Sequence, residues 1–134
     1  MIRSSSRSST GKRARRDRGA VAVEFALIAP ILLALVAGIV EFSHAYNLQI
    51  SVTQAAREAA REMAIEDDQG AAATAAAAGA PGLTTGNFQY AFSPASCAAG
   101  QNMTVTITYP AATLTGIFGS TVTVTGVGAM RCGG

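Results

Sequence analysis

The hydropathy pattern of the chain changes abruptly close to its N-terminus. Residues 1–19 are polar and rich in arginine and serine, whereas residues 20–40 form an apolar run with one ionisable side chain, Glu24. At about 1.5 Å per residue, a helix of this length spans roughly 31 Å, which matches the hydrocarbon core of a bilayer at about 30 Å. The pattern therefore predicts a single transmembrane helix over residues 20–41.

A helical period continues beyond the apolar run. Alanine and larger apolar side chains recur at intervals of three and four residues from Leu48 to Met63, and charged or amide side chains occupy the opposite positions. This pattern predicts an amphipathic helix over residues 42–66. The alanine-rich stretch that follows is closed by glycine and proline, so we expect a short second helix over residues 70–79. A low-complexity linker is the alternative for this stretch.

The last third of the chain has a period of two. Alternating apolar and polar side chains predict strands at residues 88–92, 103–109, 120–125 and 127–132. The last of these is either a separate strand or a continuation of the one before it. Pro110 and the glycines at 116–119 are expected to form turns. The predicted fold class is α+β, in which a small antiparallel sheet within residues 87–132 packs one face on the long N-terminal helix.

Charge is distributed unevenly along the chain. Residues 1–19 hold seven basic side chains and one acidic one, a net charge of +6, whereas the rest of the chain has a net charge of −4. Because basic flanks stay on the cytoplasmic side of a membrane helix, we expect this leader in the cytoplasm and residues 42–134 outside it. A nucleic-acid-binding arm would also be basic, but this leader has no aromatic residue and runs directly into the apolar segment, so we expect no nucleic acid partner. Its polarity predicts a disordered segment.

Both cysteines of the chain, Cys97 and Cys132, lie in the part expected outside the cytoplasm, where a disulfide can form and persist. A bond that closes a loop of this length would stabilise a small domain by about 3–4 kcal/mol in the chain-entropy model. Two unrelated free thiols are the alternative. Metal binding would need more ligands than two cysteines and the lone His44 provide.

The sequence offers no recognisable catalytic set. It has one histidine, and no serine or cysteine is adjacent to a base. Glu58 and Glu62 alternate with arginines, as on a solvated helix face. We therefore expect a protein that is not an enzyme and that has no cofactor, no metal and no small-molecule substrate.

Glu24 needs an explanation of its own, since a carboxylate within a membrane segment is costly. It lies five residues into the run, where snorkelling could keep it hydrated. Alternatively, cleavage after Gly19 would free the α-amine of Ala20, which could neutralise Glu24 of the same or a neighbouring chain and fix axial register in an assembly. A removable secretory signal, cut after Ala37 or Gly38, is a further alternative, but such a signal has a shorter apolar core.

The N-terminal half resembles a known family. Gly19, followed after four residues by Glu24 and Phe25 at the head of an apolar helix, resembles the class III signal of type IV pilin-like proteins, which a prepilin peptidase cuts on the cytoplasmic side. Three further stretches are similar to the TadE-like pseudopilins of tight-adherence (Tad) pilus systems: residues 40–46, 53–61 and 128–131.

This resemblance implies a type IV pilin-like fold, with Gly19 before the cut, Ala20 as the mature N-terminus, and Glu24 and Phe25 as residues that set assembly and register. Major pilins of such systems are usually very short after processing, whereas this chain keeps more than 90 residues beyond the apolar run. The resemblance therefore implies a minor pseudopilin that takes part in pilus assembly or adhesion.

The implied partners are the membrane, the prepilin peptidase, other pilins or pseudopilins and the pilus assembly platform. The implied location is the cytoplasmic (inner) membrane, crossed once, with incorporation into a pilus as a further step. The competing hypothesis is a signal-anchored, single-pass envelope protein whose exported part binds a partner unrelated to pili.

Overall fold

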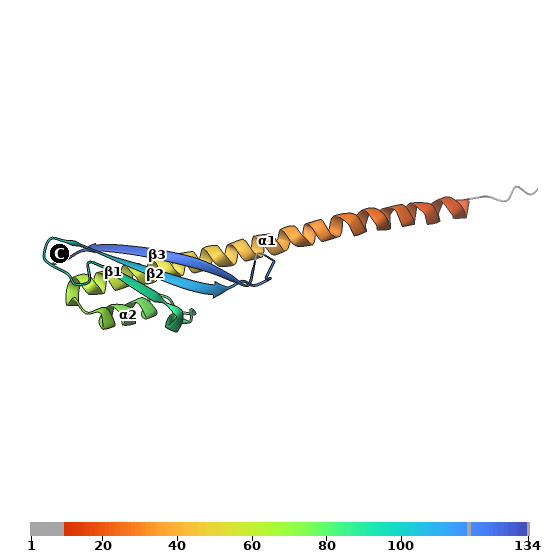
Figure 1. The fold of residues 1–134 in the computed structure, drawn as a ribbon. Helices are drawn as coiled ribbons and strands as arrows, with labels where there is room; N and C mark the ends of the chain where they lie inside the picture. The colour runs from red at the N-terminus through yellow and green to blue at the C-terminus, as the bar shows by residue number, and fades with distance from the viewer. Residues whose placement is uncertain (1–9, 118, 134) are drawn as a thin grey trace, which may run out of the picture. The chain divides into compact units, whose positions relative to one another are not determined.

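The computed structural model describes residues 10–117 and 119–133, with side chains from Arg18 onward. The chain divides into two units, Met1–Ile39 and Val40–Gly134. We call the second unit the head. Helix α1 (Thr10–Glu66) supplies the described part of the first unit and the first element of the head (Figure 1). The helix contains Pro30 in its interior.

Helix α1 begins earlier than the hydropathy pattern indicates. Residues 10–18 are helical, although the sequence predicts a disordered leader there; residues 1–9 lie outside the described part of the chain. Arginine, lysine and alanine have good helix propensities, and extending an existing helix is much less costly than nucleating one. The expectation of disorder at residues 10–18 is therefore wrong.

Within the head, α1 is amphipathic in the way that its sequence predicts. The stripe of small and apolar residues is fully buried, and it consists of Val52, Ala55, Ala56, Ala59, Ala60 and Met63. The helix ends at Glu66. The next residue, Asp67, has a left-handed φ of 51°, and its amide donates to the carbonyl of Met63 at 3.1 Å. Aspartate tolerates this conformation better than most residues, which explains why the helix stops there.

Helix α2 (Gln69–Ala78) agrees to within one residue with the helix predicted over 70–79. The Asp68 side chain caps its N-terminus by accepting a hydrogen bond from the amide of Ala71 at 2.7 Å. Ala72 and Ala76 are buried, one turn apart on the same face. Alanine at these positions lets the short helix pack closely on the rest of the head.

The head contains one antiparallel sheet with strand order β1-β2-β3. Its strands are β1 (Gln89–Ser93), β2 (Asn102–Ala112) and β3 (Thr121–Arg131), and a 3-10 turn, η1 (Thr85–Asn87), precedes them. The predicted α+β fold class is confirmed. The fourth candidate strand is a continuation of β3, which runs through Gly126 without a break.

The turn expected at Pro110 does not form there. Pro110 lies inside β2, opposite Thr123 of β3. Strand β1 pairs only with residues 104–108 of β2, so β2 has an open edge at Pro110, where a residue without an N–H group is tolerated. The two strands are joined instead by the loop between Ala112 and Thr121. We call the described residues of this loop, 113–117 and 119–120, the β2–β3 loop.

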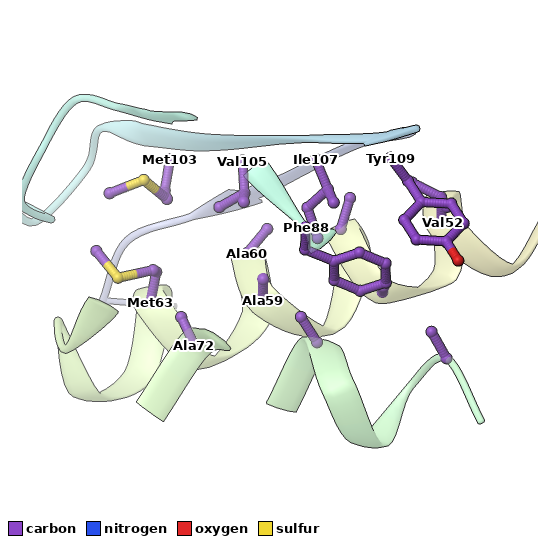
Figure 2. Close-up of a cluster of buried hydrophobic side chains, with 14 of the residues drawn as sticks. Val52, Ala59, Ala60, Met63, Ala72, Phe88, Met103, Val105, Ile107 and Tyr109 are labelled. Carbon is purple, nitrogen blue, oxygen red and sulfur yellow. The ribbon is translucent and has the colours of Figure 1, made fainter. Parts of the chain in front are cut away.

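The core of the head lies between α1 and the inner face of the sheet. Residues Met103, Val105, Ile107 and Tyr109 alternate along β2 with half-buried threonines, and their side chains point toward α1 (Figure 2). Ala72 of α2 and Phe88 reach the same cluster, and Phe88 packs edge-on against Tyr109 with ring centroids 5.4 Å apart. The predicted packing of one sheet face on the amphipathic part of the helix is thus present.

Two glycines bring β3 into direct contact with the backbone of α1. A Cβ atom at Gly126 would overlap main-chain atoms of Val52, and one at Gly128 would overlap those of Ala56. Two residues of a strand and four residues of a helix both advance by roughly 6–7 Å, so these two contacts are in step. They also show that β3 runs in the same direction as α1 within the head.

Candidate functional site

The predicted processing residues all lie on α1, outside the head. Gly19, Ala20, Glu24 and Phe25 are exposed, and the Phe25 side chain is 70% exposed. Helical geometry places Glu24 one turn beyond Ala20 on the same face. The structure therefore brings the α-nitrogen of Ala20 and the Glu24 side chain to neighbouring turns of one helix.

Nothing in the described structure requires glycine at position 19. A Cβ atom there would meet no heavy atom within 4 Å, and Gly19 is not among the residues with a positive φ. A glycine inside a helix costs about 1 kcal/mol relative to alanine. Gly19 therefore lowers helix stability without a packing benefit, as does Gly38, whose surroundings are equally open. Recognition by another molecule is a physical reason to keep such a residue.

The apolar run does not bury itself. By length and composition, α1 contains one segment that could cross a membrane, and none of that segment is buried within the structure. Its large apolar side chains are all more than half exposed from residue 21 to residue 39: Val21, Val23, Phe25, Leu27, Ile28, Ile31, Leu32, Leu33, Leu35, Val36 and Ile39. A continuous apolar surface of this extent needs lipid or protein to cover it. The helix is thus unlike the core helix of a soluble domain.

Glu41, the first residue after the apolar run, forms a hydrogen-bonded cluster that was not predicted from the sequence. Glu41 is only 7% exposed. Its Oε1 atom accepts from the amide of Leu114 at 3.0 Å, and its Oε2 atom accepts from the amide and the hydroxyl of Thr115, both at 2.9 Å. One carboxylate therefore satisfies two amides of the β2–β3 loop that have no strand partner.

The partners of Glu41 lie 73 and 74 residues away in sequence. No local motif or spacing connects an acidic residue after an apolar run with a loop so far along the chain. The one available signal was position: a carboxylate at the boundary of a membrane-length segment is expensive to leave unpaired. That signal shows that a partner is needed but not which one.

A disulfide joins Cys97 to Cys132, the pairing proposed from the sequence, with Cα atoms 5.6 Å apart. It ties the connection between β1 and β2 to the residue after β3. Main-chain hydrogen bonds support the same junction, including one from the amide of Cys132 to the carbonyl of Gln101 at 2.8 Å. The side chain of Asp67 accepts from the amide of Cys97, so the end of α1 is fastened there too.

Ligand chemistry is sparse in the part of the chain that the structure describes. Within residues 18–117 and 119–133, no three histidine, cysteine, aspartate or glutamate side chains gather as a metal site would require. His44 is partly exposed on α1, three residues beyond Glu41. Three features of the described residues have a clear physical role: the exposed apolar helix, the Glu41 cluster and the disulfide.

Comparison with known families finds a match within the N-terminal half of the chain. A family model described as TadE-like protein matches residues 19–61, and this match confirms the resemblance seen in the sequence. The matched family implies an association with Tad pilus components and with the membrane. No curated protein and no solved structure matches the chain. The match begins at Gly19 and ends at Arg61, so the sheet lies outside it.

Proposed function

We propose that this chain, with its TadE-like segment, is a minor pseudopilin of a Tad pilus. In this proposal a prepilin peptidase cuts it between Gly19 and Ala20, and the product takes part in pilus assembly or adhesion. One observation carries the proposal: the family match starts at Gly19, a glycine that the local structure does not need.

The charge distribution supports a cytoplasmic leader. Residues 1–19 carry a net charge of +6 and the remainder −4, with the apolar run between them. Basic residues beside a membrane helix are retained in the cytoplasm, so the cut would fall on the cytoplasmic side of the inner membrane and the head would lie outside. The disulfide of the head fits that placement, because disulfides persist in oxidising compartments.

Cleavage would give Glu24 a partner. The new α-amine of Ala20 would carry a positive charge at the start of a helix, one turn from the carboxylate. In an assembly, the same carboxylate can pair with the amine of a neighbouring chain, and the cost of leaving either charge alone in lipid would fix the register between helices.

The exposed apolar helix supports a function in association with other helices. Helices that associate in membranes use small residues to approach closely, and the run contains a series of them: Ala26, Ala29, Ala34, Ala37 and Gly38. The large apolar side chains between them are exposed and available for packing against other pilin-like helices. We propose no catalytic activity and no cofactor for this protein.

A second candidate function is a single-pass envelope protein whose head binds a partner unrelated to pili. One observation favours it: the family match stops at Arg61 and leaves the sheet without a known counterpart. In that case the N-terminus would not be cut after Gly19. Processing therefore separates the two functions.

The test is co-expression of the full chain with the prepilin peptidase of its own system. We expect the Gly19→Leu variant to accumulate as uncut precursor, because a large side chain should not fit a site selected for glycine. Gly38→Leu is the matched control. Gly38 is also helical, and a Cβ atom built there would meet no heavy atom within 4 Å. Normal cutting of Gly19→Leu, or equal inhibition in both variants, would contradict the proposal.

A further inference from the structure

The β2–β3 loop carries two large apolar side chains that the head leaves uncovered. Leu114 is 58% exposed and Ile117 is 59% exposed. From Ala111 to Met130 the sequence contains no charged residue, so no charged side chain of the hairpin itself opposes contact with an apolar medium. Exposed leucine and isoleucine at the tip of a hairpin, without flanking charges, are an unusual surface for a loop that faces only water.

Glu41 fixes this loop to the start of the head. The carboxylate holds the amides of Leu114 and Thr115 at 3.0 and 2.9 Å. Glu41 follows directly on Val40, the last residue of the run. Helical side chains lean toward the N-terminus of their helix, so the Glu41 carboxylate leans toward the first residue of the head. The loop is thus attached where α1 leaves its apolar segment.

The direction of β3 leads to the same placement. Gly126 lies against Val52 and Gly128 against Ala56, so β3 runs parallel to α1. Following β3 backward from Gly126 to its first residue, Thr121, covers about 16 Å, which corresponds to roughly eleven residues of helix. That distance leads from Val52 back to Glu41. The β2–β3 loop is therefore at the end of the sheet that lies beside Glu41, close to the first residue of the head.

We propose that the β2–β3 loop is a second membrane contact, in which Leu114 and Ile117 insert into the interfacial layer of the leaflet where α1 emerges. This rests on the membrane-spanning placement within the proposed function. The occupant of the apolar surface is lipid, because the attachment to Glu41 holds the loop at the level where the span ends. Phe42 and Tyr46 on α1 are also exposed, at 74% and 62%, and aromatic side chains are enriched at this depth.

Such a contact would orient the head. A single helix anchor leaves a domain free to tilt about the membrane exit, whereas two contacts on different elements restrict that motion. Burying two apolar side chains to the depth of the headgroup and acyl boundary is the mode by which monotopic proteins bind bilayers. In this chain the loop and the helix would act together, joined by the Glu41 carboxylate.

The test uses tryptophan as a depth probe, because the chain has none of its own. Full-length Ile117→Trp and, separately, Leu114→Trp are reconstituted in phosphatidylglycerol and phosphatidylethanolamine vesicles that contain brominated acyl chains. We expect blue-shifted emission and strong quenching by bromine placed near the headgroups. Val127→Trp is the control for the head, since Val127 is 52% exposed on the outer face of β3, and we expect it to remain unquenched.

Leu33→Trp, within the apolar run, distinguishes failure of the loop contact from failure of the membrane span. If Leu33→Trp is quenched by bromine deep in the bilayer while both loop probes are not, the loop contact is overturned and the span stands. If none of the three is quenched, both the span and the loop contact fail. If the loop probes are blue-shifted but unquenched, and the shift grows with the protein-to-lipid ratio, a second copy covers the loop and the lipid proposal is overturned.

Discussion

Substituting Gly128 with alanine should destabilise the head, because the added methyl group would overlap main-chain atoms of Ala56. Alanine in place of glycine usually stabilises a fold by about 0.4–1 kcal/mol through the unfolded state. Overpacking a close contact costs about 1–3 kcal/mol, and here the obstructing atoms are backbone, which cannot rotate away as a side chain can. Overpacking is the larger effect, and the net loss should be about 1–2 kcal/mol.

The assay is thermal unfolding of the full chain in mild detergent, followed by near-ultraviolet circular dichroism of the tyrosines in the head. For a domain of this size, a loss of about 1–2 kcal/mol lowers the midpoint by roughly 4–16 °C. Gly86→Ala is the matched control: Gly86 lies in η1, its Cβ would meet nothing within 4 Å, and we expect no loss of stability. An unchanged or raised midpoint for Gly128→Ala would refute the close approach of β3 to α1.

Three further predictions address the disulfide and the two glutamates. Cys132→Ser should reduce the stability of the head by about 3–4 kcal/mol in the chain-entropy model, measured by the same thermal unfolding; a midpoint equal to that of the oxidised protein would contradict it. Glu41→Gln should speed hydrogen exchange at the amide of Leu114, since an amide group presents one acceptor oxygen where the carboxylate presents two; protection as in the wild type would count against the Glu41 cluster. Glu24→Ala should insert in the membrane normally, as judged by fractionation, yet impair pilus assembly, as judged by electron microscopy, with Glu66→Ala as control. Normal pili in this variant would instead favour a Glu24 side chain that is kept hydrated by snorkelling and has no role in assembly.

The elements of the fold were predictable where a periodic pattern extends over several turns or residues. The alanine and methionine stripe from Val52 to Met63 predicted the buried face of α1, and the threonine alternation predicted β2 and β3. These signals are local, since each depends on which face of one element is buried. The α+β class followed from them directly.

Features that depend on tertiary context were not predictable. Pro110 was expected to end a strand, and it does not because β1 is too short to pair with that part of β2. The sequence left open whether a strand continues past Gly126, where the absence of a side chain admits the backbone of α1. Glu41 had no visible partner, because its partners lie 73 and 74 residues away. In each case the deciding atom belongs to a segment remote in sequence.

Processing after Gly19 is the central claim of this account, and the mature N-terminus tests it most directly. The exported form should be purified from cells that carry the complete pilus system, and its N-terminal peptide identified by mass spectrometry. The account predicts a chain that begins at Ala20. A chain that begins at Met1, or one that has lost its apolar run by a cut after Ala37 or Gly38, would contradict it.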